Sequence, residues 1–177
     1  MGGVRFTQFY NCACCCPSRA SLLTGLYPHE AGIGHMVYND YGEGYLGNLN
    51  DQCVTIGEVL KRAGYQTMFV GKWHRGHAPE SRPEVRGFDR VTGVYPHIDS
   101  YWKALKGCDI YIDEEILIPA GENPVNPYHQ DKEFYTIDFF TDVALDYINQ
   151  ARTRPEKPFL LRLCYNTPHF PLETSEF

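Results

Sequence analysis

The 177-residue sequence has no apolar run of membrane-spanning length and no excess of basic residues. Without such a run, we expect no membrane-spanning segment. Sixteen Lys and Arg stand against 22 Asp and Glu, which gives a net charge of −6. Because no basic patch offsets phosphate repulsion, nucleic acid is not an expected partner. The first residues also lack the pattern of a signal peptide.

A second pair of closely spaced cysteines is missing as well. Four of the seven Cys lie together at Cys12, Cys14, Cys15 and Cys16, and the other three are scattered singly. A closed zinc site usually has two ligand pairs separated by a loop. Adjacent Cys in an extended chain also point in different directions, which predicts poor chelation. A zinc or disulfide knuckle is therefore the less favoured alternative, and the odd count leaves at least one thiol unpaired or modified.

Alternating strand and helix patterns indicate the fold class. With 43% hydrophobic residues, the chain has enough apolar material for one folded domain, which we place at residues 1–177. Strands are predicted at 4–10, 66–70 and 158–165, the last of them buried, and helices at 18–23, 55–63 and 134–152. The apolar stripe of the last helix is expected at Ile137, Phe140, Ala144, Tyr147, Ile148 and Ala151. This order predicts an α/β fold with a mainly parallel sheet flanked by helices.

Three polar segments follow the predicted strands. They are the Cys run, Gly71–His74 and Asn166–His169. Open α/β sheets place their sites at the carboxyl ends of their strands. Ser18 is the expected N-cap of the helix after the Cys run, and a helix N-terminus favours an anion. The sequence therefore predicts an anion site at this edge of the sheet.

Three motifs carry a resemblance to a known family. Cys15–Gly25 reads C-x-P-S-R followed by L-L-T-G, and Gly64–His74 reads G-Y-x-T-x-x-x-G-K-W-H. Tyr165–Pro171 contains T-P-H-x-P. Together they resemble the motifs of the type I, formylglycine-dependent sulfatases, which have an alkaline-phosphatase-like fold. The resemblance implies a hydrolase that cleaves sulfate monoesters.

The resemblance also implies a role for each motif residue. Cys15 is expected to be oxidised to formylglycine by a formylglycine-generating or sulfatase-maturating enzyme, and its hydrate is the implied nucleophile and a ligand of calcium or a similar divalent cation. Arg19 holds the hydrate, and Lys72 binds a sulfate oxygen. His74 takes a proton from the hydrate, and in a strand-like segment it would point the same way as Lys72, two residues before it. His169 contacts sulfate and protonates the leaving oxygen.

Other expectations follow from the same family. The implied substrate is a sulfated small molecule or glycan, and the implied location is periplasmic, secreted or lysosomal. A phosphonate or phosphodiester hydrolase and a non-catalytic fragment stay open as alternatives. Family members are longer and carry paired Asp residues that bind the metal, so we expect an N-terminal-half fragment, incomplete at both ends and inactive alone.

Arg75, where the family usually has Leu, is expected to face solvent. Asp138, Asp142 and Asp146 are expected on a solvated helix face.

Overall fold

The computed structural model describes residues 3–38, 40–96, 100–102, 108–122 and 125–173. Its elements are α1 (Cys15–Thr24), α2 (Ile56–Arg62), β1 (Gln66–Lys72), a 3-10 turn (Pro79–Ser81), β2 (Arg90–Val94), β3 (Ile110–Ile112), β4 (Glu115–Ile118), α3 (Thr136–Ala151) and β5 (Phe159–Cys164). Within these ranges, no helix combines the length and the apolar character needed to cross a membrane.

The strands form one five-stranded sheet in the order β4-β3-β2-β1-β5. β1, the middle one of the three parallel strands, runs parallel to both neighbours, with Met68 opposite Arg90 of β2 and Gln66 opposite Phe159 of β5. β3 and β4 continue the sheet as antiparallel strands. The predicted mainly parallel sheet is therefore confirmed, and the carboxyl ends of β1, β2 and β5 lie at one edge.

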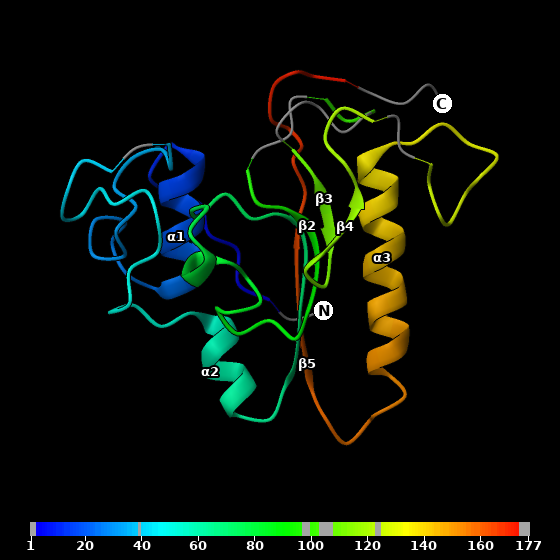
Figure 1. Cartoon of the computed structure of the whole chain (residues 1–177). Coiled ribbons are helices and arrows are strands. Elements are labelled where there is room, and N and C mark those ends of the chain that lie inside the picture. The colour runs from blue at the N-terminus through cyan, green and yellow to red at the C-terminus, as the bar shows by residue number, and fades with distance from the viewer. Residues whose placement is uncertain (1–2, 39, 97–99, 103–107, 123–124, 174–177) are drawn as a thin grey trace.

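Helices cover both faces of the sheet. In Figure 1, α1 and α2 lie on one side and α3 lies on the other. α3 buries Phe140, Val143 and Tyr147 against Met68 and Val70 of β1. The opposite layer joins residues of α1 to the other face of β1 in a second cluster that includes Leu23, Phe69, Trp73 and Phe88. The period of the α3 stripe matches the prediction, with Phe139 and Val143 buried in place of the expected Ile137 and Ile148.

Two strand predictions differ from the structure. Residues 4–10 form no strand, and Val4, Phe6 and Tyr10 are 70% or more exposed. A strand-compatible sequence needs a neighbouring strand to pair its backbone, and within the described residues this segment has none. β5, predicted to be buried, is an edge strand with Phe159 and Leu163 exposed, because β1 covers only one of its sides.

The first helix begins earlier than predicted. α1 starts at Cys15, after the N-cap Cys14, and not after Ser18. The Ser18 amide donates to the Cys14 carbonyl at 3.0 Å, so Ser18 lies inside the first turn. Proline is tolerated there because its missing N–H has no helical partner in that turn, and Pro17 therefore does not delay the helix. Cys15 thus occupies the first helical position.

Candidate active site

Arg19 joins the motif helix to the ends of two strands. Its guanidinium donates to the Lys72 carbonyl at 2.9 Å and to the Tyr165 carbonyl at 3.3 Å. These carbonyls lie at the carboxyl ends of β1 and β5, which are parallel neighbours. The contacts fix the amino end of α1 above that edge of the sheet. The prediction gave Arg19 a role on the reacting group, and the structure adds this positioning role.

Cys15 and His74 come together although they are 59 residues apart. The Cys15 Sγ atom lies 3.4 Å from His74 Nδ1. We expected His74 to continue the strand alternation of Lys72, but β1 ends at Lys72 and His74 has a left-handed φ of 55°. The His74 amide donates to the Tyr95 carbonyl at 2.8 Å, which holds the turn. The turn, and not the strand, directs this fully buried imidazole to the thiol.

The neighbouring thiols have opposite electrostatic environments. Hydrogen bonds from Cys16 and then His74, with the charges of His74 and Lys72, hold the pKa of Cys15 well below its usual range, although burial opposes them. The pKa of Cys16 is raised by its contact with Cys15 and by burial. Of the two thiols, Cys15 is therefore the one that this environment favours as a thiolate. A thiolate is the reactive form of cysteine.

Two buried side chains near the strand ends have polar atoms without partners. Lys72 is 1% exposed, and its Nζ makes no hydrogen bond within the described part of the chain. Burial lowers the pKa of Lys72, and the Cys15 charge acts in the opposite direction. Asn166 is 4% exposed, and both of its side-chain amide atoms are also unpaired there. Buried polar groups normally have partners, so these atoms indicate a place for a polar ligand.

Asn166 was not among the predicted site residues. Its position directly after β5, inside the segment that contains His169, was the available signal. Its burial depends on how the chain leaves the sheet. Sequence spacing alone does not define that path.

His169 lies beyond the end of β5 and has a different set of contacts. The Nδ1 atom of His169 is 2.6 Å from the Phe170 carbonyl oxygen. The Tyr101 hydroxyl donates to the backbone carbonyl of His169. The parallel pairing of β1 and β5 brings its segment to the same edge as Lys72. Cys15, Arg19, Lys72 and His74 thus form one connected group, and the role of His169 as an acid stays a prediction.

The expectation that Arg75 faces solvent is wrong. Arg75 is completely buried, and its guanidinium stacks 4.4 Å above the Trp73 ring. Its Nε donates to the Arg19 carbonyl at 3.0 Å. Burial, followed by the charge of Arg162, lowers the pKa of Arg75 well below its usual value. The nearby Trp73 offers an aromatic face on which a guanidinium stacks, which explains why a cation is accommodated here.

The donor atoms beside Cys15 do not match calcium. Cys15, Cys16 and His74 offer two sulfurs and one nitrogen, all within 4.8 Å of one another. Calcium takes six to eight oxygen ligands. No other group of three or more His, Cys, Asp or Glu donors comes this close within the described ranges. The role of Cys15 as a metal ligand after conversion stays a prediction, because the unconverted thiol, Cys16 and His74 offer no oxygen to calcium.

Cys15 borders an open hollow of about 470 Å³. The hollow is lined by Asn11, Ala13, Cys14, Cys15, Ser18, Arg19, Leu22, Arg162 and Cys164. Cys15 is half-buried, so its thiol is supported by the protein on one side and can be reached from the other. This is the exposure that a reacting or modified side chain requires.

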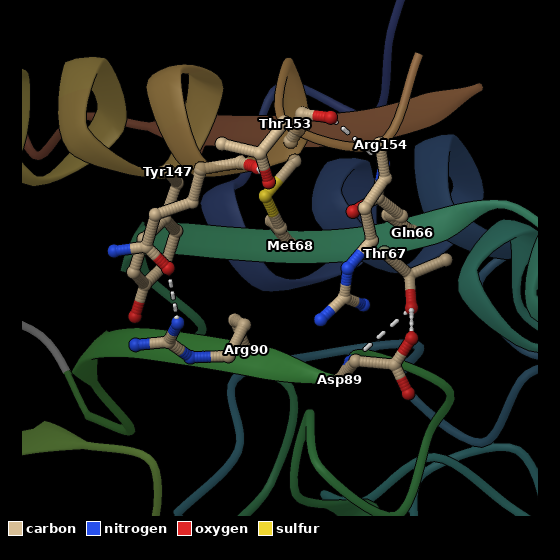
Figure 2. Close-up of a pocket in the computed structure, with 10 residues that line it drawn as sticks. Gln66, Thr67, Met68, Asp89, Arg90, Tyr147, Thr153 and Arg154 are labelled. Carbon is tan, nitrogen blue, oxygen red and sulfur yellow. Dashed lines mark hydrogen bonds between the residues drawn. The ribbon is translucent and has the colours of Figure 1, made fainter. Parts of the chain in front are cut away.

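A second hollow of about 430 Å³ lies at the opposite, amino end of β1 (Figure 2). Its polar side chains bind one another. The Thr67 hydroxyl donates to the Asp89 carboxylate at 3.1 Å, and Arg90 donates to the Gln150 side-chain oxygen at 2.7 Å. Gln66, Thr67 and Met68 of the second motif line this hollow, but none of the candidate site residues Cys15, Arg19, Lys72, His74 and His169 does. It is therefore separate from the group around Cys15.

Comparison with known proteins gives one family for the whole chain. The family described as "Sulfatase" matches residues 1–176. The chain is 30% identical to an arylsulfatase of Klebsiella aerogenes over 184 residues, which cover 98% of this chain and 37% of that protein. It is 33% identical to mouse N-acetylgalactosamine-6-sulfatase over 181 residues, covering 98% of this chain and 34% of that protein.

Solved structures are similar in fold. The crystal structure of "Ps i-CgsB in complex with k-i-k-neocarrahexaose" matches with a TM-score of 0.70 and 25% identity. The match covers 91% of this chain and 36% of that one. The chain thus spans only about a third of the length of the relatives it matches.

Proposed function

The chain belongs to the sulfatase family, with the alkaline-phosphatase-like fold of its structural neighbours, and we propose that it carries the nucleophile segment of an enzyme that hydrolyses sulfate monoesters. The observation that carries this proposal is the contact between Cys15 and His74 beside the buried Lys72. It supports a reacting group at Cys15, with a proton acceptor and a cation next to it.

Cys15 is proposed as the residue that a maturating enzyme converts to formylglycine. When formed, that group supplies two hydroxyls on one carbon, one to attack sulfur and one to release sulfate. The site residues support such a conversion, because Cys15 is half-buried on a hollow and begins α1. A group there lies at the positive end of a helix, which favours anions.

Lys72 is proposed to bind a sulfate oxygen. Its ammonium is desolvated and has no hydrogen-bond acceptor within the described residues, so an anionic oxygen is the partner it lacks. A preorganised cation in a buried site stabilises developing charge more strongly than it does in water. Asn166, with its unpaired amide, is proposed as a second polar contact near the same strand ends.

His74 is proposed as the base that takes a proton from the group at position 15. Its Nδ1 is within hydrogen-bonding reach of the atom that Sγ now occupies, as proton transfer requires. His169 is proposed as the acid that protonates the leaving oxygen, and also as a contact to sulfate. Arg19 and Arg75 hold α1 in place through their hydrogen bonds to the carbonyls of Lys72 and Arg19, respectively.

We propose that the whole enzyme uses calcium or a similar cation, as is typical of the family, but we assign it no complete ligand set in this chain. The described residues offer no oxygen cage for it, so no step here depends on it. The proposed substrates are sulfated small molecules or glycans. The similarity to an arylsulfatase and to N-acetylgalactosamine-6-sulfatase supports both classes.

The test compares the turnover of different substrate classes by the protein as its organism produces it, with Cys15 converted. We expect release of sulfate from an aryl sulfate or a sulfated sugar, with Cys15→Ala as the inactive control. Faster turnover of a phosphodiester or phosphonate monoester than of any sulfate ester would contradict the proposal and favour the related hydrolase. No turnover of either class by the converted protein would favour a non-catalytic role.

A further inference from the structure

Three donor atoms at the start of α1 lie close enough to share one ion. The Sγ atoms of Cys15 and Cys16 are 3.9 Å apart, and His74 Nδ1 is 3.4 Å from Cys15 Sγ. With metal–sulfur bonds of about 2.3 Å, two sulfurs on a tetrahedral ion lie about 3.8 Å apart. The spacing therefore needs adjustments of only a few tenths of an ångström. The extended chain assumed from the sequence predicted thiols that point apart, and the helical turn brings them together instead.

We propose that in the unmodified protein Cys15, Cys16 and His74 bind one copper(I) ion, with the thioether of Met36 as the fourth ligand. This inference does not rest on sulfate hydrolysis, because it concerns the chain before any conversion of Cys15. It assigns a second chemistry to the same residues.

Met36 identifies the kind of metal. Its Sδ atom lies 3.8 Å from Cys15 Sγ and 3.7 Å from Cys16 Sγ, and 3.5 Å from the thiol of Cys14. Thiolate and thioether ligands select copper(I), whereas structural zinc sites are built from Cys, His and carboxylates. The group has no carboxylate oxygen, which disfavours hard cations. The sulfur-rich set thus favours copper(I) over zinc.

The surroundings hold the donors in place and leave a way in. Cys16 and His74 are completely buried, and Cys16 packs in the apolar cluster that contains Met36. Cys15 borders the hollow described above, which gives an ion access. Copper(I) enters as the reduced ion, so no electron is transferred, and each thiol that becomes a ligand releases its proton.

Copper binding and conversion to formylglycine exclude each other. The thiol that would be oxidised is the one that binds the metal, so a copper-loaded chain should resist conversion. A converted chain has lost the Cys15 sulfur and should bind copper(I) weakly. The cluster would thus keep the unmodified nucleophile segment inert wherever copper(I) is present.

The experiment is an anaerobic titration of the unmodified 177-residue chain with copper(I), in competition with a chromophoric copper(I) chelator. We expect one equivalent to bind tightly. Loss of a supporting group near a metal typically costs 10–100-fold in affinity, so Cys16→Ser should weaken binding by about a hundredfold or more. Met36→Leu, which keeps the volume, should weaken it by about tenfold. Cys12→Ser is the matched control, because that thiol is exposed and its contact is with Ser21.

Several results would overturn the proposal. Equal affinities of the Cys12→Ser and Cys16→Ser variants would show non-specific thiol binding, and tighter binding of zinc than of copper(I) would exclude the assigned metal. A larger loss with Cys14→Ser than with Cys16→Ser would assign different ligands. Because Cys16 is buried, circular dichroism must show that its variant folds. If it does not, X-ray absorption of the copper-loaded wild-type chain decides, since a shell of sulfur without an imidazole nitrogen contradicts the proposed site.

Discussion

Beyond the carboxyl ends of β1 and β5 two buried polar side chains have atoms without partners in the described chain, whereas the polar side chains at the amino end of β1 are paired. Lys72 and Asn166 have unsatisfied atoms within the described chain. At the other end Thr67 binds Asp89, and Asp89 in turn binds Lys61 at 2.7 Å. Both ends have a hollow, and Figure 2 shows the residues that line the one at the amino end. Since both ends have a hollow, the candidate site differs from the amino end in its unpaired buried atoms and not in the presence of a cavity.

Replacing Lys72 should give the largest effect. In the protein as its organism produces it, with Cys15 converted, Lys72→Met should reduce turnover by about a hundredfold or more, because one preorganised charge contact is lost. The same change should leave the free energy of unfolding unchanged or higher, since it removes a buried, unpaired ammonium. Steady-state rates and thermal unfolding measure the two effects. Wild-type turnover in the folded variant would refute the role of Lys72.

Alkylation should distinguish the neighbouring thiols in the unconverted chain. Burial, followed by the charge of Cys15, raises the pKa of Cys14, whereas the pKa of Cys15 is lowered. Below the ordinary thiol pKa, Cys15 should therefore stay a thiolate and react with iodoacetamide at least about tenfold faster than Cys14. Peptide mass spectrometry after timed quenching at pH 6 gives both rates. Equal rates would mean that His74 and Cys16 do not stabilise the Cys15 thiolate.

The contribution of His169 to turnover should depend on the leaving group of the substrate. A general acid helps a poor leaving oxygen more than an activated phenol. In the converted natural protein, His169→Ala should therefore slow an alkyl or sugar sulfate more than a nitrophenyl sulfate, by about tenfold or more. Equal losses on the two substrates would leave His169 with sulfate binding alone.

The smallest effect is expected at the amino end of the sheet. Thr67 is fully buried, donates to the Asp89 carboxylate, and accepts from the Asp89 amide at 3.2 Å. Thr67→Val keeps the shape and removes both bonds, so it should destabilise the fold by about 1–2 kcal/mol. Denaturant unfolding measures this change. Unaltered stability would show that the pairing at this end contributes little, and a loss of turnover in the stable variant would break the comparison between the two ends.

The sequence predicted the parallel strands β1 and β5 and the meeting of the motif segments at one edge of the sheet, because β1, α3 and the motif segments have clear local patterns. It did not predict contacts that depend on long-range packing. The burial of Arg75 requires Trp73 and α1 to meet, and the proximity of Cys15 and Cys16 requires the helix to begin at Cys15. The edge position of β5 depends on strand order, which no single segment encodes.

The central claim is that Cys15 is the reacting residue, and its conversion can be measured directly. The chain should be produced together with a formylglycine-generating enzyme, digested, and analysed by mass spectrometry with an aldehyde-reactive hydrazide. We predict that the aldehyde forms at Cys15 alone, because only this Cys has Pro two positions later and Arg four positions later. An aldehyde at Cys14 or Cys16, or an unmodified Cys15 despite a competent enzyme, would contradict the account.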